Sequence, residues 1–404
     1  MKNCIKGLIA ALLAVTMTFL CCSCFDTANT TETMDDNPIK LTKKYDGKEV
    51  SFLPPPVSSY LKAETEKEQA EILKQNEFSA CYGLNAEFYW ESDEAEEFIV
   101  HFSKNSDFSE ETVARSFSTS LEDFGVLSEL LPGEKYYWKV TDAAGEKTSA
   151  TDSFVYKDEA VRIIVADGAT NIRDIGGWKT TGGKTVAYGK IFRGGRLNDI
   201  KANGKKTFNQ RLKIKTELDL RKDSDDGGQK ECAFGENVAY KKLSLGQYGY
   251  VIPSFKEDKP YFRRYDGYSC ETIGKIFALF ADEENYPIYY HCNAGADRTG
   301  TLTFLLNGFL GVPYESLVKD FELTSFSSYG KRWRGEISDE RFINGVMQDD
   351  NLNYVAFGEL YELIMTNYAK DGESLPAAIE KYLKNECGVS DSQLKKIRHI
   401  LIGD

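Results

Sequence analysis

The chain has 404 residues, of which 41% are hydrophobic, and its formal net charge is −13. That length exceeds one ordinary domain and predicts two globular domains, each with its own core. The acidic balance argues against a general nucleic-acid binder, so we expect no nucleic-acid partner. The chain has only three histidines, and no paired-cysteine motif occurs after residue 24, which gives little support to a metal site or a metal cofactor.

Residues 1–24 have the layout of a bacterial lipoprotein signal. Two lysines precede an apolar run over residues 7–20, which is too short for a comfortable membrane span. Cysteines stand where a cleavage site would lie, and Cys24 is the predicted lipidated residue, with Cys22 as the alternative. A plain cleaved signal and a single anchoring helix are the other interpretations. All three predict export, and the first predicts a lipid anchor in the bacterial cell envelope, on the periplasmic or cell-surface side.

Residues 25–49 are rich in threonine, asparagine, aspartate and lysine, which predicts a flexible tether. We expect residues 50–157 to form an all-β sandwich with a short leading helix over residues 61–74. Alternating or aromatic runs that are typical of strands occupy residues 86–90, 97–102 and 136–140. Residues 131–140 and 153–156 resemble a fibronectin type III domain. A protein or a carbohydrate is the candidate contact partner of this domain, and the alternative is that the domain binds neither.

Residues 158–404 alternate between strand-like and helical runs. This rhythm predicts an α/β domain with a mostly parallel central sheet flanked by helices. Strand-like runs occupy residues 190–192, 216–220 and 287–291. Helical patterns occupy residues 271–280, 299–310, 360–368 and 375–383.

One segment of this second domain has the pattern of an anion-binding loop. The apolar run over residues 287–291 stops at Cys292, and a helix is predicted to begin near Arg298. A strand, a tight loop and a helix start aim backbone N–H groups and the positive end of a helix dipole at one point, which suits a phosphate dianion. The same donors lower the pKa of a central thiol and make it a thiolate nucleophile. The residues predicted to bind the phosphate are Asn293, Ala294, Gly295, Ala296 and Thr299.

Arg298 follows Cys292 by six residues. Its planar guanidinium can hold two phosphoryl oxygens while they gather charge in a transition state. Gly295 lets the loop turn, and the Thr299 hydroxyl can hydrogen-bond the sulfur and favour the leaving thiolate. The alternative is a buried structural cysteine beside an unrelated arginine.

The spacing Cys-x5-Arg followed by Thr resembles the signature of protein tyrosine phosphatases. The longer form over residues 291–300 is similar to a bacterial tyrosine phosphatase family with atypical loops, the family 3 tyrosine-protein phosphatases. Further segments that match this family, in order, are residues 171–177, 191–197, 217–221, 310–313 and 320–323. The resemblance covers the chain from about residue 167 onward and implies a phosphatase fold and a phosphocysteine intermediate, with no cofactor. Ala296 stands where that family often has lysine, and Gly194 where it often has serine; the first departure weakens the expected recognition of multiply phosphorylated lipids or sugars.

The leaving oxygen of a phosphate ester needs a proton from a nearby carboxylic acid. No Trp-Pro-Asp segment occurs, and the resemblance implies that Asp297 is this acid and then the base that activates water. Its alternative role is a structural salt bridge to a neighbouring arginine, and its rivals as acid are Asp266, Asp219 and Asp174. Three residues are predicted either to brace the loop or to contact substrate: Arg173, Asp174 and Arg193. A tyrosine-rich segment over residues 248–268 either walls a pocket for an aromatic phosphoester or packs in the core.

The sequence therefore predicts a protein tyrosine phosphatase-like hydrolase whose partner is a phosphorylated protein or a small phosphoester. Phosphoinositide or inositol phosphate hydrolysis is an alternative, because the loop recognises a phosphate and not what carries it. A surface binding protein with a degenerate phosphatase domain is a second alternative, against which the intact Cys292, Asp297 and Arg298 argue. Rhodaneses and arsenate reductases also place cysteine in such a loop, but they lack the combination of Thr299 and Gly300 with the upstream Asn-x-Arg-Asp segment.

Overall fold

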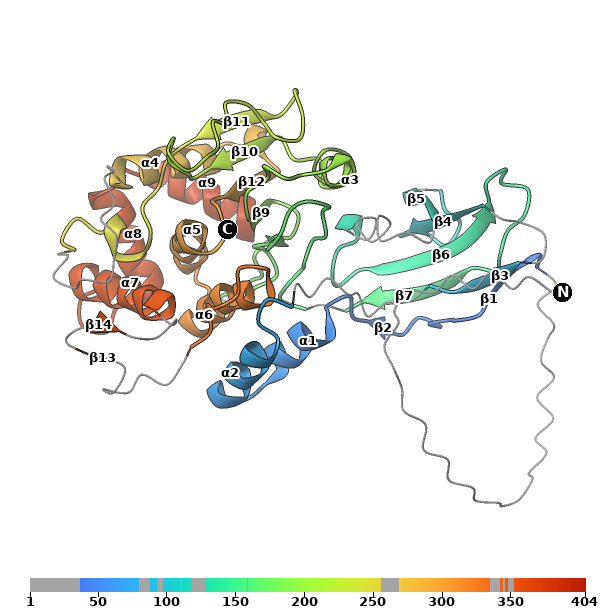
Figure 1. The fold of residues 1–404 in the computed structure, drawn as a ribbon, viewed down its shortest axis with the longest axis horizontal. Helices are drawn as coiled ribbons and strands as arrows, with labels where there is room; N and C mark the ends of the chain where they lie inside the picture. Colours follow the sequence, from blue (N-terminus) through green and yellow to red (C-terminus); the bar gives the residue numbers. More distant parts are fainter. Residues whose placement is uncertain are drawn as a thin grey trace, which may run out of the picture. The chain divides into compact units, whose positions relative to one another are not determined.

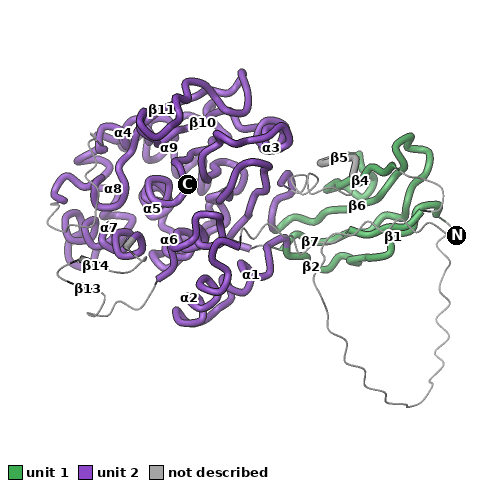
Figure 2. Tube along the Cα trace, viewed as in Figure 1, with its two compact units in different colours: residues 1–51, 85–126, 133–157 green, residues 52–84, 127–132, 158–404 purple. Residues whose placement is uncertain are grey.

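The computed structural model of the protein describes residues 37–79, 88–92, 97–109, 111–117, 128–157, 159–255, 269–334, 342–343, 346–347 and 352–404. Two compact units divide the chain (Figure 2): unit 1 comprises residues 1–51, 85–126 and 133–157, and unit 2 comprises residues 52–84, 127–132 and 158–404. The predicted signal over residues 1–24, with Cys22 and Cys24, lies outside the described residues, and so does Asp266.

Unit 1 is built on a five-stranded sheet with the strand order β2-β7-β6-β4-β5. Its strands are β2 (Glu49–Val50), β4 (Phe98–Ser103), β5 (Glu111–Phe117), β6 (Lys135–Asp142) and β7 (Asp152–Tyr156). The β2 and β7 pair is parallel, and the other neighbours are antiparallel. A two-stranded antiparallel sheet joins β1 (Ile39–Leu41) and β3 (Trp90–Ser92). Alternate side chains of β6 are fully buried, because every second residue of a strand faces the same side; these are Tyr136, Trp138 and Val140.

The described part of unit 1 contains the strands predicted over residues 97–102 and 136–140, as β4 and β6. Of the strand predicted over residues 86–90, only Trp90 lies in a strand, and residues 86 and 87 are outside the described part. The structure also differs from the predicted tether, because β1 lies within it, β2 begins at its last residue, Glu49, and Ile39 is fully buried. Such short strands were not recognisable, since three residues are too few to display an alternation. The fibronectin type III assignment stays a prediction.

Two short helices replace the single helix predicted over residues 61–74: α1 (Pro55–Lys62) and α2 (Glu66–Gln75). The Thr65 hydroxyl accepts a hydrogen bond from the Glu68 N–H at 3.2 Å, and the Glu68 carboxylate accepts one from the Thr65 N–H at 3.2 Å. This capping box starts a new helix. Both helices belong to unit 2 and not to the predicted sandwich, because their apolar side chains pack in its core: Val57, Tyr60 and Leu73.

Unit 2 contains a five-stranded sheet with the order β11-β10-β12-β9-β8. Its strands are β8 (Arg173–Asp174), β9 (Ile191–Gly194), β10 (Thr216–Asp219), β11 (Ala239–Lys242) and β12 (Ile288–His291). All neighbouring pairs are parallel except β8 and β9, which are antiparallel. The predicted α/β domain with a mostly parallel sheet is therefore present.

Helices and helical turns complete unit 2 (Figure 1). The helices are α3 (Ala202–Lys206), α4 (Ser269–Phe280), α5 (Asp297–Phe309), α6 (Tyr314–Glu322), α7 (Leu352–Tyr368), α8 (Leu375–Asn385) and α9 (Asp391–Ile402). The short elements are η2 (Thr207–Arg211), η3 (Tyr248–Val251), η4 (Glu283–Asn285), η5 (Leu323–Phe326), β13 (Phe342–Ile343) and β14 (Val346–Met347). Within the part of the chain that the structure describes, no helix has the length and apolar character needed to cross a membrane.

The sheet of unit 2 has a core on each face, as expected for buried parallel strands. Ile288 and Tyr290 of β12 belong to a core that includes residues of α4, α5, α7, α8 and α9. Tyr289 belongs to a second core together with Phe208 and Leu212, next to α3. Helix α5 packs against β12, α6 and α8, and almost all its side chains are buried. The strand and the helix on either side of the predicted loop are therefore held firmly.

Candidate active site

The loop over residues 292–296 joins the end of β12 to the start of α5, as the sequence predicted. Strand β12 lies between β9 and β10, so three parallel strands end beside the loop. Ligand sites of open parallel sheets form at this edge. Cys292 stands at the beginning of the loop and is only 2% exposed.

The carbonyl groups of the loop are bound from outside it. The Asn293 carbonyl accepts a backbone N–H at 2.9 Å. The Asn171 amide donates to the carbonyls of Ala294 at 3.0 Å and Gly295 at 3.1 Å, and Arg193 donates to the latter at 2.8 Å. A trans peptide points its C=O and the following N–H in opposite directions. The N–H groups that follow these carbonyls are therefore turned inward, which makes an anion cradle.

Two glycines permit this loop path. Gly295 has a φ of +67°, and a Cβ added there would lie 2.2 Å from the carbonyl carbon of Gly194. A Cβ on Gly194 would in turn lie 2.4 Å from the hydroxyl oxygen of Tyr289. That hydroxyl donates to the Gly195 carbonyl at 2.6 Å. Tyr289 thus fills the space that a serine side chain at position 194 would need.

The Cys292 thiol is an acidic one. Burial raises its pKa, but the charge of Arg298 and the adjacent side chain and backbone N–H of Thr299 outweigh burial and bring the pKa below its ordinary value. The Thr299 side chain is fully buried, and its hydroxyl has no nitrogen or oxygen partner among the described residues. Cys292 therefore has the thiolate character that a nucleophile needs.

Arg298 lies in the first turn of α5 and forms an ion pair with Asp225, with 2.8 Å between Nη1 and Oδ2. The Asn293 side chain amide donates to the same Asp225 oxygen at 3.3 Å. Sequence reasoning missed Asp225. The sequence signal that could have identified it is the group of three aspartates within residues 223–226, directly after the predicted strand end at residues 217–221.

Arg173 and Arg193, two residues with alternative predicted roles, support the loop from behind. Both are buried, and both bind the buried carboxylate of Asp320. Arg193 also donates to the Gly295 carbonyl, and the Arg173 guanidinium donates to the side chain oxygen of Asn171 at 2.7 Å. These contacts fit bracing rather than substrate contact.

Asp174, the third of these residues, has a different set of contacts. Its carboxylate pairs with Arg162 at 2.7 Å and accepts the N–H groups of Gly176 and Gly189. Its role in these contacts is to fix the turn after β8. All three of these partners of Asp174 lie outside the loop over residues 292–296, which does not favour Asp174 as a rival acid.

Asp297 lies at the first position of α5, but its carboxylate is tied to a neighbouring arginine. Arg332 donates from Nε to Oδ1 at 2.9 Å and from Nη2 to Oδ2 at 3.1 Å, and the Tyr248 hydroxyl also binds Oδ1. Burial raises the pKa of Asp297, but the charge and hydrogen bonds of Arg332 outweigh it, and the pKa is lowered. These are the contacts of the structural salt bridge that the sequence left open as the alternative. The role of Asp297 as general acid stays a prediction.

Tyr248 itself is buried and packs edge-on against Phe321, with 6.2 Å between ring centroids. It therefore contacts the active-site loop through Asp297 and does not form an open aromatic wall. Of the other tyrosines in the predicted wall, Tyr250 packs against Phe255, and Tyr261, Tyr265 and Tyr268 lie outside the described residues.

Two other buried groups flank the nucleophile. His291 pairs with Glu217, with 2.9 Å between Nε2 and Oε1, and its Nδ1 lies 3.1 Å from the Cys292 carbonyl oxygen. Burial lowers the pKa of His291, but the hydrogen bond and the charge of Glu217 raise it by more, so the pKa lies above its ordinary value. Burial raises the pKa of Asp219, but hydrogen bonds from Arg221 lower it to about 2, so this rival acid is also held ionised.

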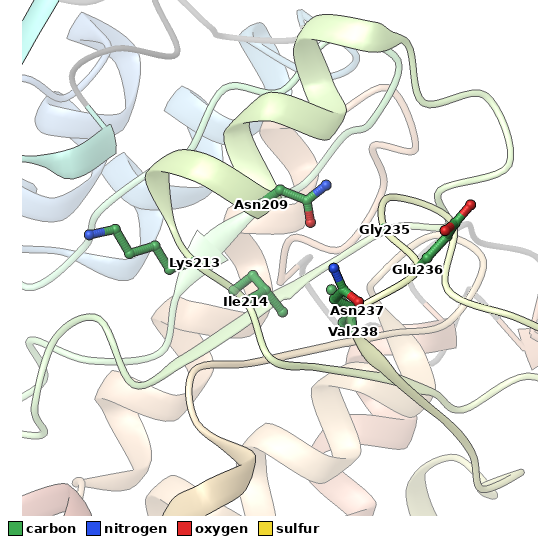
Figure 3. A pocket seen from close by; sticks show the side chains of 7 residues that line it. All are labelled: Asn209, Lys213, Ile214, Gly235, Glu236, Asn237 and Val238. Atoms are coloured by element: carbon green, nitrogen blue, oxygen red, sulfur yellow. The ribbon is translucent and has the colours of Figure 1, made fainter.

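A separate hollow of about 500 Å³ lies in unit 2, between η2 and the segment before β11 (Figure 3). Its lining includes Asn209, Lys213 and Glu236 and shares no residue with the loop over residues 292–296. Among the described residues, no three histidine, cysteine or acidic side chains are grouped to hold a metal ion.

A cysteine with a lowered pKa, an inward-facing N–H cradle and an arginine at the helix start define a phosphate loop of the cysteine-dependent phosphatase class. The chain belongs to the tyrosine phosphatase family, whose sequence profile matches residues 164–403, more than half of its length. The match begins close to the residue at which the sequence resemblance was predicted to begin.

Two curated relatives are similar to this chain. A protein of Cupriavidus necator assigned as a tyrosine-protein phosphatase is 25% identical over 168 residues, which cover 38% of this chain and 60% of the relative. A tyrosine-protein phosphatase of Nostoc commune is 23% identical over 202 residues, which cover 46% of this chain and 66% of the relative. The chain thus spans about 60% to 66% of the length of these relatives.

Two solved structures also match. One is the core catalytic domain of the PP-IP phosphatase SIW14 from S. cerevisiae in complex with citrate, with 15% identity, a TM-score of 0.25, and coverage of 35% of this chain and 74% of that one. The other is the SIW14 catalytic core, with 16% identity, a TM-score of 0.26, and coverage of 35% and 73%. These TM-scores are too low to support a shared overall arrangement.

Proposed function

We propose that the protein hydrolyses phosphomonoesters of the phosphotyrosine type through a phosphocysteine intermediate. The observation that carries this proposal is the Cys292 thiol, whose pKa is lowered by Arg298 and Thr299 at the mouth of an N–H cradle. Family membership supports the same class of activity. A cysteine that served only in core packing would not need a positive charge and N–H donors around its sulfur.

The proposed reaction has two steps. The Cys292 sulfur attacks phosphorus, while the Arg298 guanidinium and the loop N–H groups hold the equatorial oxygens as charge gathers on them. A carboxylic acid protonates the leaving oxygen and then, as carboxylate, takes a proton from the water that hydrolyses the phosphocysteine. Thr299 stabilises the thiolate that leaves in the second step. The chemistry uses no metal ion and no organic cofactor.

The preference for phosphotyrosine over inositol phosphates is part of this proposal. Ala296 is fully buried and supplies no cation at the position where the resembling family often has lysine. A substrate with several phosphate groups therefore gains no extra charge partner from this position. Turnover of a phosphotyrosine peptide should exceed that of an inositol polyphosphate at equal concentration, and the reverse order would assign the alternative substrate class.

The test of the reaction itself is hydrolysis of an aryl phosphate by the wild type and by Cys292→Ser in the presence of a chelator. We expect the wild type to keep its activity in chelator and Cys292→Ser to lose at least about 10⁴-fold, as removal of a covalent nucleophile does. Equal activity of the two proteins, or loss of wild-type activity with chelator, would contradict the mechanism. No phosphate release by pure wild type would instead favour a degenerate phosphatase domain that only binds.

Export and lipid anchoring are likewise proposed, on the sequence of residues 1–24. Labelling with a radioactive fatty acid in a bacterial host should mark the wild type and not Cys24→Ser. Label that persists in Cys24→Ser but is lost in Cys22→Ser would move the modification to the alternative residue. The fibronectin type III-like unit is proposed to contact a protein or a carbohydrate at the cell envelope.

A further inference from the structure

The proposed reaction needs a carboxyl group that first donates and then accepts a proton beside the phosphate loop. We propose that this group is Asp225, with Asp297 acting as a positioning residue. The inference rests on the proposed function and names a catalytic residue for it.

Asp225 reaches the reacting site directly. Its Oδ2 lies 2.8 Å from Arg298 Nη1 and 3.3 Å from Asn293 Nδ2, so it contacts both the transition-state arginine and the loop. Its Oδ1 is buried and has no hydrogen-bond partner among the described residues. The side chain as a whole is 30% exposed. Oδ2 thus contacts the residues that bind the phosphate, while Oδ1 has no hydrogen bond that would prevent it from carrying a proton.

The turn that carries Asp225 leaves its carboxylate as the one directed at the loop. Lys242 binds the carboxylates of Asp223 and Asp226. Asp226 also accepts the Gly228 N–H at 2.6 Å, where Gly227 and Gly228 have φ values of +70° and +81°. The contacts of Asp226 fix the turn after β10, while the Asp225 carboxylate pairs with Arg298 of the phosphate loop instead of Lys242.

Asp297 has the opposite character. Both of its oxygens are bound by Arg332, and the Tyr248 hydroxyl binds one of them as well. A carboxylate that is gripped on both oxygens by a guanidinium is favoured in its ionised form and has no proton to give. Its position in the first turn of α5 suits a different task, which is to tie the loop to the segment that carries Arg332.

The proton balance closes over one turnover. In the first step the sulfur–phosphorus bond forms, the bond to the leaving oxygen breaks, and the Asp225 proton passes to that oxygen. In the second step a water oxygen bonds to phosphorus, the sulfur leaves as thiolate, and the water proton returns to Asp225. When substrate enters, Arg298 exchanges the Asp225 carboxylate for phosphoryl oxygens, which leaves both oxygens of Asp225 available for the proton transfer.

The test compares two substrates that differ only in the leaving group: p-nitrophenyl phosphate, which needs little protonation, and phenyl phosphate, which needs it strongly. With the full chain, Asp225→Asn should lower kcat for phenyl phosphate by about 10²–10⁴-fold, the usual contribution of a general acid, and lower kcat for p-nitrophenyl phosphate far less. Asp225→Ser removes the same carboxyl and should give the same split, which covers the case of one variant that fails to fold. The matched control is Asp223→Asn, at a side chain 97% exposed in the same turn, and it should leave both rates unchanged.

Each other outcome has a defined meaning. Equal losses on both substrates, or no loss, in the Asp225 variants would overturn the inference and leave the proposed function standing. If Asp297→Asn lowered kcat for phenyl phosphate much more than for p-nitrophenyl phosphate, and Asp225→Asn did not, Asp297 would be the general acid instead. A wild type that hydrolyses neither substrate would overturn the proposed function itself.

Discussion

Replacement of Asp320 by asparagine tests how the loop is held. The Asp320 carboxylate is buried between two buried guanidinium groups, with 2.9 Å between Arg173 Nε and Oδ1 and a short contact from Arg193 Nη1 to Oδ2. Arg193 in turn binds the Gly295 carbonyl at 2.8 Å. Asp320→Asn keeps the shape of the side chain but leaves two buried positive charges with no counter-charge.

The expected cost follows from these contacts. Removal of one partner of a buried ion pair costs about 3–5 kcal/mol, because the remaining charge stays buried and unpaired. The asparagine oxygen still accepts one hydrogen bond, so we expect the lower end, about 3 kcal/mol of the free energy of unfolding. The Gly295 carbonyl loses a firmly placed donor, so kcat/KM for p-nitrophenyl phosphate should fall by about tenfold or more under conditions in which the variant is still folded.

Urea unfolding followed by circular dichroism measures the stability term. The matched control is Glu380→Gln, which removes the half-exposed pair of Glu380 with Arg398 (2.7 Å apart, both side chains 30% exposed) and should cost less than about 1 kcal/mol. If Asp320→Asn lost no more stability than Glu380→Gln, the reasoning about a buried, shared carboxylate would be refuted.

Three further predictions concern the nucleophile and its neighbours. Arg298→Lys should lower kcat/KM about 10²–10³-fold, because a lysine cannot hold two phosphoryl oxygens with one planar group; an activity within a few-fold of wild type would contradict this. Iodoacetamide should alkylate Cys292 readily below about pH 8.5, the ordinary pKa of cysteine, because the pKa of Cys292 is lowered. Arg298→Met should move this reaction to higher pH. Identical pH profiles for the wild type and Arg298→Met would show that Arg298 does not cause the lowered pKa. The His291 and Glu217 pair should stabilise most between about pH 5 and 6.5, since the pKa of Glu217 is lowered despite burial and that of His291 is raised. The stability difference between wild type and Glu217→Gln should shrink as pH falls through the Glu217 pKa and as it rises through the folded His291 pKa, and a difference independent of pH would exclude the pair as its source.

The phosphate loop was predictable because its signals are local. An apolar strand that stops at Cys292 and a helix that begins close to Arg298 are both legible in a short stretch of sequence, and β12 and α5 lie where these signals place them. The α/β rhythm was legible for the same reason. The helix α9 was not predicted, although its signals are also local: a capping box joins Ser390 and Gln393, and the buried side chains of the helix recur every three or four residues.

The contacts that decide the chemistry were not predictable, because they join residues far apart in sequence. Asp225 meets Arg298, and Asp297 meets Arg332, only through the packing of unit 2. The family resemblance and the position beside Arg298 made Asp297 the candidate acid, whereas spatial contacts distinguish a carboxylate bound on both oxygens from one with a free oxygen. The short strands β1 and β2 likewise take their order from pairing partners and not from their own few residues.

The central claim is that Cys292 becomes covalently phosphorylated during turnover. Rapid acid quench of the full chain with an aryl phosphate, followed by peptide mass spectrometry, measures this directly. We predict one added phosphoryl group on the peptide that contains Cys292. With a substrate that has a good leaving group, a variant that lacks the base of the second step should accumulate more of this phosphorylated peptide, because its hydrolysis is slowed. Phosphoryl transfer to another residue, or turnover with an aryl phosphate without any phosphorylated Cys292, would contradict the account.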